Sequence, residues 1–160
     1  MQHQVENEFS FSHAHYALKG ITREQIFKNL SWKISDDLGL SAPIVTESLE
    51  HIYKHREIIL GPGLAIFDWQ NDDIFSPYVA IFHLDHHVLL RSRETYPTKY
   101  VVVLVSPASQ SLTHLRHLAR ISRLFHSHNI LESLSRAQSE DGLLAVLNAD
   151  YLAKRESFAA

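Results

Sequence analysis

The chain has 160 residues, which is room for one domain of ordinary size rather than two. Hydrophobic residues make up 45%, charged residues 21%, and the net charge is −3 with histidine neutral, so nothing indicates the basic excess of a nucleic-acid-binding protein. The absence of cysteine excludes a disulfide framework, a thiolate zinc site and a cysteine nucleophile. The unusual feature is the count of twelve histidines, and the question is which of them take part in chemistry.

The sequence indicates no targeting or membrane segment. Met1–Ser10 is polar and acidic and has no apolar core of the kind that a secretory signal needs. The longest strongly apolar run, Tyr100–Val105, is too short to span a bilayer. We therefore expect a cytoplasmic protein that neither inserts into a membrane nor binds nucleic acid.

The first part of the chain predicts one extended segment and two helices. Phe9–Leu18 alternates loosely, as a strand or extended arm does, and Gly20 ends it. Thr22 and Gln25 have the spacing of a capping box, and the apolar periodicity that follows predicts a helix ending at Gly39. A second helix is expected from Ser41–Pro43 onward, with proline in its first turn.

The middle of the chain predicts short strands separated by turns. Gly61–Gly63 is a tight turn, and the polar residues Asp85–His87 are expected to form another. The unbroken apolar sequence of the last strand suits a central strand that is buried on both faces. The expected strands are Glu57–Leu60, Leu64–Phe67, Tyr78–Leu84, Val88–Arg91 and Lys99–Val105.

Three helices are expected after the last strand, over 109–126, 130–137 and 141–153. For the first of them the periodicity predicts an inner face of Leu112, Leu115, Leu118, Ala119 and Phe125, and an outer face of Arg116, Arg120 and Arg123. The order of elements favours a single α/β domain: a mixed sheet of about five strands, parallel and antiparallel, with helices on both faces.

Nine of the twelve histidines fall into four groups, His13/His15, His83/His86/His87, His114/His117 and His126/His128. His114 and His117 lie one helical turn apart and could share a metal, but no third ligand stands at a diagnostic spacing. We therefore interpret most histidines as surface or partly buried residues and expect no metal and no cofactor. A histidine-rich metal-binding protein is the alternative.

Two segments are better candidates for chemistry. The expected buried strand Lys99–Val105 leads through a serine-rich loop into the helix expected over 109–126. The free N–H groups at such a helix N-terminus favour an anion. The candidate anion-binding residues are Arg56, Ser106, Ser109 and Ser111. The alternative is an ordinary strand-to-helix connection with the serines as caps. Asp68, at the end of the strand after Gly-Pro-Gly, is either a functional carboxylate or a solvated one.

Five segments occur in the order found in a known family: Thr22–Ile26, Tyr53–Glu57, Ile58–Ile66, Tyr100–Ser106 and Thr113–Ala119. Over roughly Leu18–Tyr151 the chain resembles the enzyme IIA proteins of the bacterial phosphoenolpyruvate-dependent sugar phosphotransferase system. The class is the mannitol/fructose one, which includes the ascorbate-type and nitrogen-regulatory members. The resemblance implies an N-terminal strand or arm over 1–17, an enzyme IIA-like domain over 18–153 and a tail over 154–160.

In that family a phosphocarrier protein donates a phosphoryl group to a histidine, which passes it to a transport subunit or holds it as a regulatory mark. The resemblance places that histidine at Asp68 and the second active-site histidine at His114, so the implied catalytic pair is Asp68 and His114, facing each other. Their partner would be a phosphocarrier protein or a transporter subunit, and a homodimer is an alternative to the monomer.

The departure at Asp68 implies a regulatory or partner-binding module in which the fold is kept and the relay is lost. One alternative is an active relay in sugar uptake that uses a different acceptor residue. Another is an acyl phosphate on Asp68 itself, although a carboxylate repels the incoming dianion and such chemistry usually requires a metal.

Overall fold

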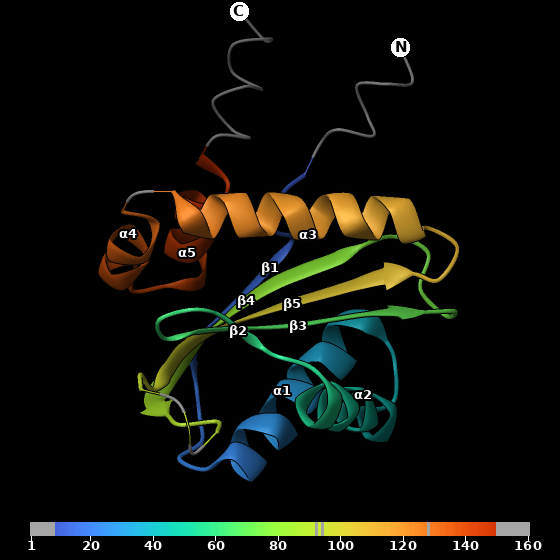
Figure 1. The fold of residues 1–160 in the computed structure, drawn as a ribbon, viewed down its shortest axis with the longest axis horizontal. Coiled ribbons are helices and arrows are strands. Elements are labelled where there is room, and N and C mark those ends of the chain that lie inside the picture. The colour runs from blue at the N-terminus through green and yellow to red at the C-terminus, as the bar shows by residue number, and fades with distance from the viewer. Residues whose placement is uncertain (1–8, 92, 94, 128, 150–160) are drawn as a thin grey trace, which may run out of the picture.

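The computed structural model describes residues 9–91, 93, 95–127 and 129–149 of the chain (Figure 1). The first eight residues of the expected arm, the last four of the helix expected over 141–153 and the tail over 154–160 lie outside this range. The elements, in chain order, are β1 His13–Leu18, α1 Arg23–Leu38, α2 Ala42–His55, β2 Ile59–Gly61, β3 Leu64–Asn71, β4 Tyr78–Val88, β5 Thr98–Pro107, α3 Ser111–His126, α4 Ile130–Arg136 and α5 Glu140–Leu147.

The five strands form one mixed sheet in the order β1-β4-β5-β3-β2. The pairs β1/β4 and β3/β5 are parallel, whereas β2/β3 and β4/β5 are antiparallel. Helices α1 and α2 cover one face of the sheet, and α3, α4 and α5 cover the other (Figure 1). The expected α/β class, strand number and two-sided helix cover are confirmed.

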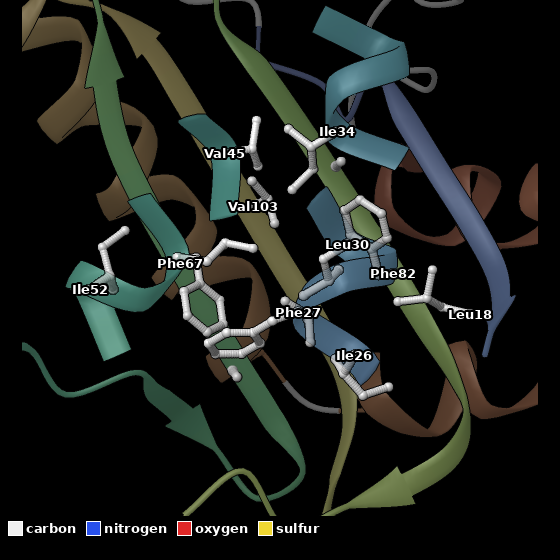
Figure 2. Close-up of a cluster of buried hydrophobic side chains, with 14 of the residues drawn as sticks. Leu18, Ile26, Phe27, Leu30, Ile34, Val45, Ile52, Phe67, Phe82 and Val103 are labelled. Carbon is white, nitrogen blue, oxygen red and sulfur yellow. The ribbon is translucent and has the colours of Figure 1, made fainter. Parts of the chain in front are cut away.

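The helix signals at the start of the chain act as the sequence predicts. The Thr22 hydroxyl accepts a hydrogen bond from the backbone N–H of Gln25, and the Gln25 side chain accepts one from the N–H of Ile21. Gly39 ends α1 in the left-handed conformation with φ 72°. The apolar faces of α1 and α2 then pack on the sheet around Phe27, Phe67 and Phe82 (Figure 2).

Two predictions for the segment 85–91 are wrong. Asp85–His87 is not a turn: β4 runs through it without a break to Val88, and Val88–Arg91 is therefore not a separate strand. The pairing of β4 with β5 shifts register between His83 and Val88, and the three polar residues lie exposed in this irregular stretch. A polar run at a solvent-facing strand end looks like a turn in the sequence because both are hydrophilic.

The predicted orientation of α3 is also wrong. Leu112 and Leu115, which the periodicity placed inside, are each 62% exposed, and His114 and His117 are buried instead. Leu118 and Phe125 do pack against the core, and Ala119 is exposed. The helix is rotated so that His114 and His117 face the sheet together with the apolar Ile121, while Leu112 and Leu115 face solvent.

Candidate functional site

The alternation of β3 places Asp68 beneath α3. Phe67 points into the core between the sheet and α1/α2, so its neighbour Asp68 faces the opposite side. Its register partner on the central strand β5 is Leu104, and Ser106 lies two residues further along the same face of β5. The Asp68 side chain is 17% exposed, which makes its carboxylate accessible from only one side.

His114 joins Asp68 to Ser106. Its Nε2 lies 2.8 Å from Asp68 Oδ2, and its Nδ1 lies 2.6 Å from Ser106 Oγ. Because an ionised carboxylate only accepts hydrogen bonds, Nε2 carries a proton, and in neutral His114 the Ser106 hydroxyl donates to Nδ1. Both ring nitrogens of His114 are therefore occupied within the protein.

Arg56 completes the cluster from the end of α2. Its Nη1 lies 3.2 Å from Asp68 Oδ1, and its Nη2 donates to the backbone carbonyl of Asp68. The end of α2 is itself held by Arg91, whose Nη2 donates to the carbonyl oxygens of Tyr53 at 2.5 Å and Arg56 at 2.6 Å. We call Arg56, Asp68, His114 and Ser106 the polar cluster.

The electrostatics of the polar cluster favour an ionised Asp68. Burial alone would raise the pKa of its carboxyl group, but the hydrogen bond from His114 and the positive charge of Arg56 outweigh that effect and hold the pKa below its ordinary value. At neutral pH the cluster therefore contains a carboxylate whose two oxygens each face a donor.

Of the three candidate anion-binding serines, one lies in the polar cluster, and the other two make no hydrogen bond with Asp68 or His114 within the described residues. Ser106 is fully buried with its hydroxyl against His114. Ser111 begins α3, and its hydroxyl bonds the Gln70 side-chain amide at 3.2 Å. Ser109 is exposed and makes no side-chain hydrogen bond with any residue that the structure describes. The polar cluster thus contains Arg56 and Ser106 of the four residues expected to bind an anion.

His117 is a buried polar residue, whereas the sequence predicted a surface or partly buried histidine. It is 8% exposed, its ring lies 5.1 Å from that of Phe9, and its Nδ1 has no hydrogen-bond partner among the described residues. Burial, followed by the positive charges of Arg120 and His114, lowers its pKa. Its place three residues after His114 on one helix face was the only signal for this burial.

Other histidines have structural partners. His15 Nε2 lies 2.7 Å from Asp37 Oδ2, an oxygen that also accepts a hydrogen bond from the Tyr78 hydroxyl. His83 Nδ1 accepts one from the backbone N–H of Ala17, where β1 has positive φ. Over the described ranges, no group of three or more histidine, aspartate or glutamate side chains is arranged to hold a metal ion. The metal-binding alternative gains no support from these residues.

Fold and cluster together define a class of protein: a single α/β domain with a mixed five-stranded sheet and a histidine on α3 facing Asp68, which lies within β3 because that strand continues past the expected end at Phe67 to Asn71. Residues 12–150 match the family described as phosphoenolpyruvate-dependent sugar phosphotransferase system, EIIA 2, so the chain belongs to that family. Within the described residues, no helix has both the length and the apolar character needed to cross a membrane.

The relatives agree with this assignment. The chain is 26% identical over 131 residues to a nitrogen regulatory protein of Bradyrhizobium diazoefficiens, a match that covers 82% of this chain and 86% of the relative. Among solved structures, the nitrogen regulatory protein IIA-Ntr of Neisseria meningitidis has a TM-score of 0.76 at 21% identity, covering 90% of this chain and 99% of that one. The cryptic mannitol-specific enzyme IIA CmtB of Escherichia coli has a TM-score of 0.62 at 18% identity, covering 86% and 92%.

Proposed function

We propose that this protein is a cytoplasmic enzyme IIA-like module that regulates or binds a partner and does not relay phosphoryl groups. By its resemblance to the family, Asp68 stands where the phosphoacceptor histidine is expected. The observation that carries the proposal is the closed polar cluster: Asp68 lies 2.8 Å from His114 Nε2 and 3.2 Å from Arg56 Nη1.

Phosphoryl transfer to this site faces two chemical obstacles. The first is charge, because an ionised Asp68 repels a phosphoryl donor, whereas a neutral imidazole has an uncharged nucleophilic nitrogen. The second is that Arg56 and His114, the groups able to stabilise an incoming phosphoryl group, are already engaged by the Asp68 carboxylate. An acyl phosphate would also call for a bound metal ion in this cluster.

The test is a phosphotransfer assay on the full chain with phosphoenolpyruvate, enzyme I, the phosphocarrier protein and a radioactive phosphorus label. We expect no label on the wild-type chain. Asp68→His should gain label, because it places an imidazole beside His114 and Arg56, whereas the matched variant Asp68→Asn should not.

Two results would contradict the proposal. Label on a histidine of the wild-type chain would establish an active relay with another acceptor, and label on Asp68 would establish an acyl phosphate. If folded Asp68→His stays unlabelled, then the residue at position 68 is not what prevents relay. Circular dichroism of each variant separates loss of transfer from loss of fold.

A further inference from the structure

The outward face of α3 is unusual because it exposes leucines on a helix that buries histidines. Leu112 and Leu115 are each 62% exposed, and Ala119 is exposed one turn further on. Spacings of three and four residues align these side chains in one stripe along the helix. The stripe begins on both sides of His114, so it adjoins the polar cluster.

The same face is basic. α3 carries Arg116, Arg120 and Arg123, and the sequence contains no acidic residue between 107 and 131. None of the three arginines forms an ion pair or a side-chain hydrogen bond with another residue in the described part of the chain. Arg116 and Arg123 share the exposed side with the leucines, so their charges are available to a partner. We call Leu112, Leu115, Arg116, Ala119 and Arg123 the α3 outer face.

We infer that the α3 outer face docks an acidic amphipathic helix of a partner protein. This inference rests on the proposed function and specifies its partner. Leucines at helical spacing next to a small alanine form a seam against which a second helix packs closely, and the flanking arginines select glutamate or aspartate on that helix. Within a protein whose net charge is −3, this local basic surface has the opposite sign from the whole chain.

A membrane surface fits these residues less well. Amphipathic helices that lie on membranes present a broad apolar face with large residues, whereas the apolar part of the α3 outer face consists of two leucines and an alanine.

The experiment uses the full ¹⁵N-labelled chain and a synthetic peptide of about 18 residues, five turns of helix, with leucine at helical spacing and glutamate beside it. The comparison peptide has lysine in place of every glutamate. We expect saturable chemical-shift changes on Leu112, Leu115 and Arg116 with the acidic peptide, and none with the basic peptide. Raising the salt concentration should weaken the binding, because exposed charges are screened.

Two pairs of variants test the residues. Leu112→Ser/Leu115→Ser should weaken peptide binding at least tenfold, whereas Leu89→Ser, which changes a leucine that is 51% exposed outside α3, should leave it unchanged. Arg116→Glu/Arg123→Glu should abolish binding to the acidic peptide and confer binding to the basic one. Lys28→Glu, at an exposed position on α1, is the matched charge control.

The inference is overturned if the two peptides bind equally, if the shifts lie away from α3, or if phosphatidylglycerol vesicles bind the chain and the acidic peptide does not. Its failure differs from failure of the proposed function. A chain that accepts phosphoryl label yet binds the acidic peptide refutes only the proposed function. A chain that stays unlabelled and binds no acidic peptide refutes only the docking surface.

Discussion

The two faces of the sheet are held by different kinds of interaction. Under α1 and α2, aromatic and aliphatic side chains such as Phe27, Phe67 and Phe82 fill the space between helix and strand. Under α3, an apolar cluster that includes Leu104, Ile121 and Leu134 is accompanied by a carboxylate, two imidazoles and a serine, while leucines of the same helix face solvent. The first face is an ordinary core, whereas the second combines an apolar core with the polar cluster and leaves two leucines of α3 exposed.

We expect the largest loss of stability from a substitution in the core under α1 and α2. Phe27 is 1% exposed and meets the rings of Tyr53 and Phe67 edge-on at 5.6 and 5.5 Å. Phe27→Ala should lower the free energy of unfolding by about 3–5 kcal/mol, because it removes a buried ring and leaves a cavity. Urea denaturation of the variant measures this loss. A loss below about 1 kcal/mol would contradict the view that Phe27 is a tightly packed residue of this core.

A smaller effect is expected in the polar cluster. Asp68→Ala removes the acceptor that faces both His114 and Arg56, and leaving the buried His114 Nε2 without a partner should cost about 1–3 kcal/mol. Arg56→Met should cost less than about 1 kcal/mol, since the arginine side chain is 46% exposed and solvent screens the pair. Equal losses of stability for the two variants would contradict the expectation that losing the partner of His114 costs more than losing the Arg56 contact.

The pH dependence of Asp68→Asn tests whether the charge of Asp68 is the source of its contribution to stability. The folded-state pKa of Asp68 is lowered, so its stabilising contribution is present above the unfolded value of about 3.9 and is lost as the pH falls through the folded value. The difference in stability between wild type and Asp68→Asn should therefore be constant near neutrality and shrink in acid below about pH 4. A difference that persists unchanged in strong acid would show that the charge of Asp68 is not its source.

The sequence predicted helix α1, on one face of the sheet, better than helix α3, on the other face. The periodicity and caps of α1 depend on local chemistry and were correct, as the Thr22 cap and Gly39 show. The resemblance brought Asp68 and His114 together as a facing pair, which spacing alone could not do across the 46 residues that separate them. The orientation of α3 was missed because the prediction took only apolar residues as inner ones, whereas His114, which bonds Ser106 and Asp68, shares the inner face with Ile121.

The smallest expected effect on stability concerns His117, the second buried histidine of α3. Its pKa is lowered chiefly by burial, and its closest ring neighbour, Phe9, offers no compensating charge. The folded state therefore keeps His117 neutral at a pH where the unfolded chain, with a histidine pKa of about 6.5, already binds a proton. Stability should consequently fall as the pH drops from about 7 towards the lowered folded value, and level off below it.

His117→Leu tests this step, because it removes the titrating group and the buried Nδ1 that lacks a partner among the described residues. Urea unfolding at several pH values between about 7.5 and 5 should give a shallower slope for the variant, by at most about 1.4 kcal/mol per pH unit, the contribution of one proton. Some slope should remain, because burial also lowers the pKa of His83. His51→Leu, which changes an exposed histidine on α2, should keep the wild-type slope. If His117→Leu keeps the wild-type slope as well, protonation of His117 does not limit stability, and the buried imidazole is tolerated in both charge states.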